Sequence, residues 1–299
     1  MVKVYKYRIY GGNIMLLRGK PVADKIKKTV INEVKNYKNN GSIVPKIAIL
    51  RVGQRPDDIS YEARVLKNCN VVGIEAEGIA IESNSETENV IKILNKLNQN
   101  PKIHGILIFR PLPEHLDTEQ ISRAILPEKD IDCMNPINIE KVFVGDKNRI
   151  APCTPEAVIE ILKYYKYDLS GKNVTIVNRS MVLGKPLSML FLDENATVTI
   201  CHSKTKDLAG ITSKADIVVT GVGRGKFFGP EYFSKESIVI DVGINFENDS
   251  ICGDVDFEAV SDKVEAITPV PGGVGTVTSM ILLNHVIKAM RLQAKMQYF

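Results

Sequence analysis

The chain has 299 residues, of which 44% are hydrophobic and 25% are charged. This composition is typical of a folded globular protein and excludes an intrinsically disordered chain, and the length favours two domains. The 39 basic and 35 acidic residues leave a formal charge of +4. The basic residues are scattered and no aromatic ladder accompanies them, so a nucleic-acid partner is not expected.

Neither a membrane segment nor a metal site is expected. No apolar run reaches the roughly 18 residues that a membrane helix requires, and the N-terminus lacks the apolar core of a signal peptide. The five cysteines form no CxxC pair, and the four histidines have no metal-ligand spacing. We therefore expect reduced thiols, a cytoplasmic location and no bound metal.

The first half of the chain alternates helices and strands. Apolar periodicity and polar N-terminal signals predict helices over residues 20–38, 58–72 and 87–99. One side of the second helix carries Tyr61, Val65, Cys69 and Val72. Strands are predicted over residues 44–52, 74–81 and 104–109. This alternation predicts an α/β fold with parallel strands.

Residues 133–155 interrupt the alternation, and their Pro, Asn and Gly content predicts a connection between domains. A helix is predicted directly after it, with Thr154 as N-cap and Pro155 at the first helical position. Further strands are predicted over residues 173–178, 196–203, 215–223 and 237–245. Further helices are predicted over residues 185–195 and 278–296. The second half therefore has the strand–turn–helix–strand order of a dinucleotide-binding fold.

The turn after the strand at 173–178 is the first candidate site. Helix N-terminal amides at such a turn bind a pyrophosphate, although residues 178–184 lack the G-x-G-x-x-G pattern and also fit an ordinary tight turn. The next strand ends in residues 201–205, which include no carboxylate to bind a ribose hydroxyl. Together with Arg179 in the first turn, this favours NADP over NAD.

Two further segments are candidates. Residues 269–275 contain three glycines and two prolines, which predicts a loop of fixed shape open to close backbone approach, or alternatively a domain hinge. Lys129-Asp130-Ile131-Asp132 places two carboxylates at i and i+2. Asp132 is expected either to line a cleft between the domains or to lie in a solvated turn.

These residues together resemble the bifunctional methylenetetrahydrofolate dehydrogenase/cyclohydrolase (FolD) family over about residues 16–290. The shared motifs include residues 17–21, 104–107, 111–113, 129–132, 152–155, 241–245, 253–255 and 269–275. The resemblance implies two α/β domains with a folate cleft between them. It implies a catalytic domain of residues 15–149 plus 276–299 and a Rossmann NADP-binding domain of residues 150–275. Residues 1–14 lie outside it as an N-terminal extension.

The resemblance also implies an activity and a site. The family oxidises 5,10-methylenetetrahydrofolate to 5,10-methenyltetrahydrofolate with NADP in one-carbon metabolism and purine biosynthesis, and then hydrolyses the product to 10-formyltetrahydrofolate. A homodimer is usual. Tyr61 matches the residue that stacks on the folate, and Asp132 matches the one that hydrogen-bonds the pterin edge. Further substrate contacts are implied for Pro271, Gly272, Gly273 and Val274. Cofactor contacts are implied for Arg179, Ser180, Gly184, His202, Ser203, Thr205, Gly221, Val222, Gly243 and Ile244.

Two departures from the family pattern concern its hydrolysis step. The family lysine four residues after the tyrosine is Val65 here, and the family glutamine that positions this lysine is Phe109. Neither side chain transfers a proton at neutral pH. Lys67 is expected to point away from that position, and Arg64 lies about 100° from it on the helix. The sequence therefore predicts a dehydrogenase with weak or absent cyclohydrolase activity.

Three alternatives stay open. The chain keeps both activities if Arg64 or an ordered water replaces the lysine. A two-domain amino-acid or shikimate-type dehydrogenase shares the cofactor-binding fold, and a non-enzymatic nucleotide-binding regulator would bind the cofactor without turnover. A smaller departure is Asn178, which replaces the glycine before Arg179 and is expected to crowd the pyrophosphate.

Overall fold

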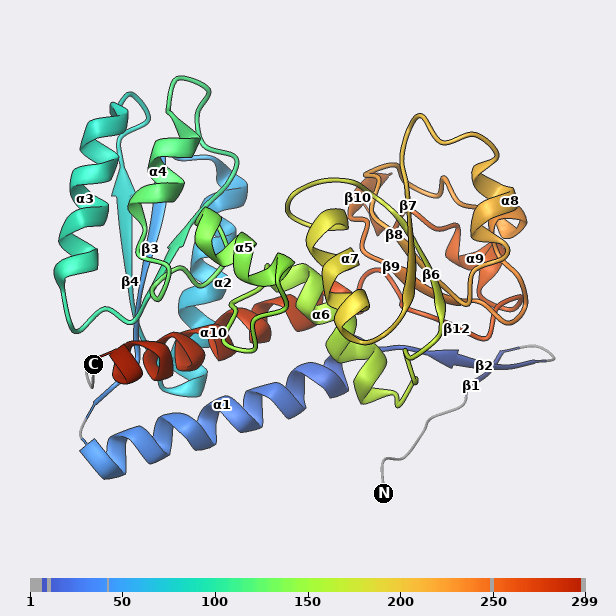
Figure 1. The fold of residues 1–299 in the computed structure, drawn as a ribbon, viewed down its shortest axis with the longest axis horizontal. Coiled ribbons are helices and arrows are strands. Elements are labelled where there is room, and N and C mark those ends of the chain that lie inside the picture. Colours follow the sequence, from blue (N-terminus) through green and yellow to red (C-terminus); the bar gives the residue numbers. More distant parts are fainter. Residues whose placement is uncertain (1–6, 10–11, 42, 248–249, 297–299) are drawn as a thin grey trace. The chain divides into compact units, whose positions relative to one another are not determined.

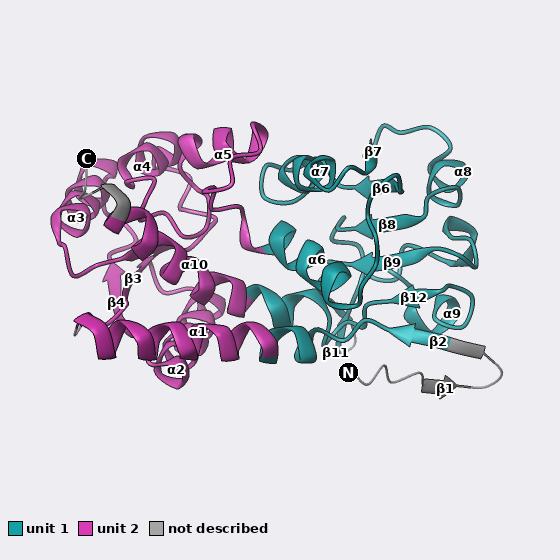
Figure 2. Ribbon diagram, turned by 60° about the horizontal axis from the view of Figure 1, so that its bottom comes forward, with its two compact units in different colours: residues 1–24, 154–278 teal, residues 25–153, 279–299 magenta. Residues whose placement is uncertain are grey.

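A computed structural model describes residues 7–9, 12–41, 43–247 and 250–296 (Figure 1). The chain divides into two compact units (Figure 2). Unit 1 consists of residues 1–24 and 154–278, and unit 2 of residues 25–153 and 279–299. Within the described residues, no helix is long and apolar enough to cross a membrane.

Unit 2 is built on a three-stranded parallel sheet with β3 in the centre. Its strands are β3 (Lys46–Val52), β4 (Glu75–Ile81) and β5 (Gly105–Ile108). Its shorter helices are α2 (Pro56–Val72), α3 (Thr87–Gln99), α4 (Thr118–Ala124) and α5 (Pro136–Phe143). Apolar residues of β3 and β5 form one buried core with residues of α3 and α4. All four residues of β5 are buried, as expected of a strand covered on both faces.

Unit 1 contains a seven-stranded sheet in the order β1-β2-β12-β9-β8-β6-β7. Its strands are β1 (Tyr7–Ile9), β2 (Gly12–Leu16), β6 (Asn173–Val177), β7 (Thr197–Cys201), β8 (Ile217–Thr220), β9 (Ile238–Asp241) and β12 (Ala266–Ile267). All pairs are parallel except β1 with β2. Because β6 lies between β7 and β8, the chain passes from β6 to β7 on one side and then crosses to β8 on the other side. The carboxyl ends of the strands at this reversal are the ligand-binding position of a doubly wound sheet.

Short elements complete unit 1. They are α6 (Cys153–Tyr164), α7 (Gly184–Asp193), α8 (Leu208–Thr212), α9 (Phe257–Val260), a 3₁₀ turn at Pro230–Tyr232, and the antiparallel pair β10 (Asn245–Glu247) and β11 (Ser250–Cys252). The second segment of unit 1 begins at residue 154, one residue after the start of α6.

Two long helices belong to both units. The first residues of α1 (Gly19–Gly41) and of α10 (Val274–Met296) are in unit 1 and the rest are in unit 2, as the colour change along each helix shows (Figure 2). The unit boundaries therefore lie inside helices, at residues 24 and 278, and differ from the expected domain boundaries at 15 and 276. The cause at the N-terminus is β2, whose Leu16 pairs with Ile267 of β12 in the sheet of unit 1.

Most predicted elements are present. The helix over 87–99 has the predicted bounds, and Val65, Cys69 and Val72 form the buried side of α2 as predicted. The N-cap prediction at Thr154 is wrong, because α6 begins at Cys153 and Thr154 lies in its first turn. Pro155 has no N–H to satisfy and is compatible with any position of that turn. The predicted connection over 133–155 contains α5, which begins at Pro136 with Asn135 as N-cap.

Candidate functional site

In unit 2, Tyr61 and Phe109 form an aromatic pair. Tyr61 lies on the second turn of α2 and Phe109 directly follows β5, and their ring centroids are 5.1 Å apart with an interplanar angle of 49°. The guanidinium carbon of Arg64 lies 5.1 Å from the centroid of the Tyr61 ring, at cation–π distance. One face of this cluster is therefore aromatic and another is cationic.

The two positions that depart from the family pattern are both buried and apolar. Val65 is 2% exposed and Phe109 is 6% exposed. Because α2 is helical through both residues, Val65 follows Tyr61 on the same side at i+4. Lys67 is exposed, as predicted. Neither Val65 nor Phe109 has an atom that donates or accepts a proton.

Burial raises the pKa of the Tyr61 hydroxyl above its usual value, and the negative charge of Asp132 raises it further. Tyr61 is therefore a neutral phenol at physiological pH. It presents a ring for stacking and a hydroxyl for hydrogen bonding, and it is not a base at neutral pH.

The Lys129–Asp132 motif separates into a structural half and a site half. Lys129 is buried, and its ammonium group donates to three carbonyl oxygens at the end of α3: Leu97 (3.1 Å), Asn98 (2.7 Å) and Asn100 (2.8 Å). The buried carboxylate of Asp130 accepts from backbone amides of the following turn, at Met134 (3.0 Å) and Asn135 (2.8 Å). Both side chains are therefore hydrogen-bonded to backbone groups of unit 2.

Asp132 is different, because its side chain is half-buried and its carboxylate pairs with a neighbouring cation. Arg110 Nη2 donates to Asp132 Oδ2 at 2.8 Å. Arg110 directly follows Phe109 in the chain, so this ion pair lies beside the aromatic pair of Tyr61 and Phe109. The structure thus brings Tyr61, Phe109 and Asp132 together in unit 2, with Arg64 and Arg110 beside them. Sequence reasoning had given Arg110 no role.

In unit 1, the turn between β6 and α7 is tied together by Asn178. Its carboxamide oxygen accepts from Ser180 N (2.8 Å), Ser180 Oγ (2.8 Å) and Gly184 N (3.0 Å), and its Nδ2 donates to Gly221 O at 2.5 Å. A Cβ on Gly184 would overlap the carbonyl oxygen of Asn178, so only glycine fits there. The bond to Gly221 joins the carboxyl ends of β6 and β8, where a doubly wound sheet binds its ligand.

The amides expected to hold a pyrophosphate at this turn already have partners. Leu183 N donates to Ser180 Oγ, Gly184 N to Asn178 Oδ1 and Lys185 N to Ser180 O. The Asn178 carboxamide therefore accepts bonds from amides at the start of α7 that were expected to face a pyrophosphate. The side chain of Arg179 in the same turn is exposed.

The turn after β7 has the chemistry of a phosphate site. His202 N donates to Thr205 Oγ1 at 2.8 Å and Thr205 N to His202 O at 2.8 Å, which closes a tight turn that leaves Ser203 and Lys204 exposed. No carboxylate is present from His202 to Lys206. The first one, Asp207, is committed as the N-cap of α8, where it accepts from Gly210 N. A cation and hydroxyls without a carboxylate fit the 2′-phosphate of NADP.

Two buried aspartates that sequence reasoning left without a role shape the loops after β8 and β9. The carboxylate of Asp254 accepts from three consecutive amides of one loop and from a side chain of the other: Val222 N, Gly223 N, Arg224 N and Asn245 Nδ2. Asp241 accepts from Gly243 N (2.9 Å), Asp254 N (3.1 Å) and Val255 N (2.8 Å). The predicted cofactor residues Gly221, Val222, Gly243 and Ile244 therefore lie on loops held by this pair.

The loop at 269–275 is hydrogen-bonded to the start of α1. The Val270–Pro271 peptide bond is cis, and Gly272 has a φ of +105°, which favours glycine. Gly19 N donates to Gly272 O at 2.8 Å, and a Cβ on Gly19 would overlap Gly273 O. Pro271 and Gly272 are exposed, whereas Gly273 and Val274 are buried where α10 begins. Gly19 belongs to the shared motif at residues 17–21, for which no role was predicted.

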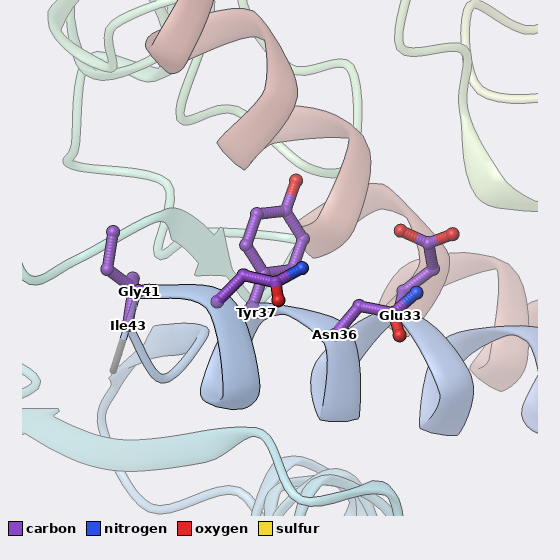
Figure 3. A pocket seen from close by; sticks show the side chains of 6 residues that line it. Glu33, Asn36, Tyr37, Gly41 and Ile43 are labelled. Carbon is purple, nitrogen blue, oxygen red and sulfur yellow. The ribbon is translucent and has the colours of Figure 1, made fainter.

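Two cavities formed by described residues lie apart from the predicted site residues. One, of about 300 Å³, lies along the end of α1 and is lined by Glu33, Asn36, Tyr37, Asn40, Gly41 and Ile43 (Figure 3). The other, of about 430 Å³, shares Tyr37 and is lined also by residues of α10. Among the residues that the structure describes, no group of three or more His, Cys, Asp or Glu side chains is arranged to hold a metal ion.

Comparison with known proteins gives consistent matches over nearly the whole chain. Residues 17–132 match the family model described as tetrahydrofolate dehydrogenase/cyclohydrolase, catalytic domain, and residues 152–294 match its NAD(P)-binding domain. The "Bifunctional protein FolD" of Clostridium botulinum (strain Kyoto / Type A2) is 54% identical over 275 residues, 92% of this chain and 97% of that protein.

Two solved structures are similar throughout. The crystal structure of the bifunctional enzyme FolD from Campylobacter jejuni has a TM-score of 0.91 at 36% identity, covering 94% of this chain and 99% of that one. The N5,N10-methylenetetrahydrofolate dehydrogenase-cyclohydrolase of Trypanosoma brucei, complexed with NADP and an inhibitor, has a TM-score of 0.89 at 31% identity, covering 94% of this chain and 98% of that one.

Proposed function

Because the chain belongs to the tetrahydrofolate dehydrogenase/cyclohydrolase family, we propose that it oxidises 5,10-methylenetetrahydrofolate to 5,10-methenyltetrahydrofolate with NADP and hydrolyses the product weakly or not at all. The observation that carries the second half is the pair of buried apolar side chains, Val65 and Phe109, at the two positions where the family uses a lysine and a glutamine. Hydrolysis needs a group that moves a proton to or from water, and these two side chains have none.

The dehydrogenase reaction makes a different demand. Bound NADP supplies the hydride acceptor, and the protein contributes binding, orientation and charge. In this proposal the ring of Tyr61 stacks on the folate, and the carboxylate of Asp132 accepts hydrogen bonds from the pterin edge. Arg179, Ser203 and Lys204 fit the 2′-phosphate because the turn after β7 offers a cation and hydroxyls without a carboxylate. The remaining predicted contacts stay part of the proposal.

A second candidate is the full bifunctional enzyme, which the names of the C. botulinum and C. jejuni relatives favour. It requires a substitute for the missing lysine. Arg64 is unsuited to this role, since a guanidinium remains protonated at neutral pH, and here it lies over the Tyr61 ring. An ordered water acting without a protein base would give slow hydrolysis.

The test is an assay that resolves the two products. Enzyme, 5,10-methylenetetrahydrofolate and NADP are mixed, and the methenyl and 10-formyl derivatives are followed separately. The proposal predicts that methenyl product accumulates and that 10-formyl product forms no faster than from methenyl derivative in buffer alone. Matched rates of formation of NADPH and 10-formyl product would establish the bifunctional enzyme instead. No turnover despite cofactor binding would favour a regulator.

A gain-of-function variant tests the cause. Val65→Lys combined with Phe109→Gln restores both members of the family pair and should make hydrolysis of the methenyl derivative enzyme-dependent. Phe109→Leu is the matched control, because it changes the same buried position without adding a polar atom and should keep oxidation without hydrolysis. If the double variant oxidises the folate but still does not hydrolyse the methenyl derivative, the two positions are not the cause of the loss.

We also propose that the protein is a cytoplasmic homodimer that serves one-carbon metabolism and purine biosynthesis. Membership of the family supports this proposal. Light scattering behind a sizing column would give twice the chain mass of 33.2 kDa for a dimer.

A further inference from the structure

The ion pair between Arg110 and Asp132 is partly shielded from solvent. Arg110 Nη2 lies 2.8 Å from Asp132 Oδ2, and the two side chains are 29% and 28% exposed. Only one nitrogen and one carboxylate oxygen make this contact. A single charge-assisted hydrogen bond of this kind fixes the orientation of the carboxylate and leaves the second oxygen, Oδ1, available to another donor.

The backbone of unit 2 brings the two residues together. Phe109 N donates to Leu50 O at 3.0 Å, so the chain continues the direction of β5 up to Arg110. The segment before Asp132 runs parallel to β5, with Ile106 paired to Asp130. Asp132 lies two residues after the bridged Asp130 and Arg110 four residues after the bridged Ile106, so both follow this parallel pair in the same direction, where their side chains meet.

The backbone of Asp132 is itself fixed by its neighbours. Asp130 accepts from Asp132 N at 3.3 Å and from the two amides described above, and Ile106 N donates to Lys129 O at 2.7 Å. A Cβ on Gly105 would crowd Ile131, so β5 and this segment are in close contact. The main freedom left to Asp132 is the rotation of its own side chain, which is the freedom that the bond from Arg110 restricts.

The charges around the carboxylate make this restriction relevant to a ligand. Tyr61, Phe109 and the apolar Val65 provide no hydrogen-bond donor for Asp132 other than the phenol. The guanidinium of Arg64 lies over the Tyr61 ring and not on Asp132. The hydrogen bond from Arg110 therefore sets the direction in which the Asp132 carboxylate points.

We propose that Arg110 is a positioning residue for the folate substrate. It holds Asp132 in one orientation before the substrate arrives, so that Oδ1 meets the N–H groups of the pterin edge without first being ordered. This inference rests on the proposed function, in which Asp132 binds the pterin. Pre-ordering an acceptor strengthens binding of the substrate and of the transition state alike, so its loss raises KM more than it lowers kcat.

The test uses steady-state oxidation of 5,10-methylenetetrahydrofolate by the full chain. Arg110→Leu should raise the KM for the folate roughly three- to tenfold, the range for a partly shielded charge-assisted bond, with kcat and the KM for NADP changed less than about twofold. Arg110→Lys should recover part of the loss, because a single N–H to one oxygen suffices. Arg123→Leu is the matched control, since it removes an exposed arginine–carboxylate pair on α4 of the same unit.

A double variant separates positioning from general loss of structure. If Arg110 acts through Asp132, then Arg110→Leu should add less than about twofold to the folate KM in an Asp132→Asn background. An unchanged folate KM in Arg110→Leu, or a full additive effect in the double variant, would overturn the inference. Absence of folate oxidation by the unmodified protein would instead overturn the proposed function, so the two failures are distinguishable.

Discussion

Lys129 lies three residues before a proposed substrate-binding residue, yet the structure gives it a purely structural role. Its ammonium group donates hydrogen bonds to the carbonyl oxygens of Leu97 and Asn98, in the last turn of α3, and of Asn100, which follows the helix. Lys129→Met keeps most of the apolar stem and removes all three donors. A bond from a charged donor contributes about 1.5–3 kcal/mol, and a cation also stabilises a helix C-terminus.

The three hydrogen bonds share one ammonium group. Burial lowers the pKa of Lys129, because removing the charged ammonium from water costs free energy. The variant no longer has that desolvation cost. We therefore expect the free energy of unfolding to fall by about 2–4 kcal/mol, less than the sum of three separate bonds. For units of this size the loss corresponds to a fall in Tm of about 5–15 °C.

The assay combines thermal unfolding, followed by circular dichroism, with steady-state kinetics well below Tm. Lys129→Met should unfold at the lower temperature while the kcat and both KM values of the folded variant stay within about twofold. Lys102→Met, at an exposed position after α3, should shift Tm by less than about 2 °C. An unchanged Tm with lost oxidation would refute this reasoning and place Lys129 in the chemical site.

Three further predictions concern unit 1. Gly184→Ala should raise the KM for NADP at least roughly tenfold and leave the folate KM little changed, because its Cβ overlaps the carbonyl oxygen of Asn178 and opens the turn. Arg179→Ala should raise the KM for NADP but not for NAD, which would be seen as a lower NADP-to-NAD ratio of kcat/KM. Burial raises the pKa of Asp241 from 3.8 to about 6, so the folded chain binds this proton more tightly than the unfolded chain. Its contribution to the free energy of unfolding is thus greatest below about pH 4, falls as the pH rises through 6, and levels off about 3 kcal/mol lower near pH 7. Urea unfolding of the unmodified protein minus that of Asp241→Asn should show this fall, and a flat difference from pH 4 to 7 would contradict it.

Sequence periodicity predicted the elements whose stability is local. The apolar stripe of α2 and the bounds of α3 were readable because each helix buries one face at a regular spacing. The pairing of β2 with β12 could not be predicted, because β12 has only two residues and Leu16 pairs with Ile267, which lies near the other end of the chain. Such a strand has too few residues to show a period, and its partner is fixed only by the completed sheet.

The site was predictable to the level of motifs and not to the level of side-chain direction. The Lys129–Asp132 motif contains three charged residues, and only the structure shows that two of them bind backbone groups while Asp132 meets Arg110. Asn178 was expected to crowd a phosphate, and the structure shows in addition that its carboxamide accepts from the Gly184 amide at the start of α7. Arg110 was detectable in principle, as a charged residue directly after a buried strand, but its partner is 22 residues away.

The central claim is that two buried apolar side chains remove one of the family's two reactions. The most direct measurement supplies 5,10-methenyltetrahydrofolate alone and follows its disappearance at increasing concentrations of enzyme. With Val65 and Phe109 in place, the rate should stay at or close to the buffer rate at every enzyme concentration, far below the rate of oxidation. A rate that rises in proportion to enzyme concentration, at the scale of the oxidation rate, would contradict it.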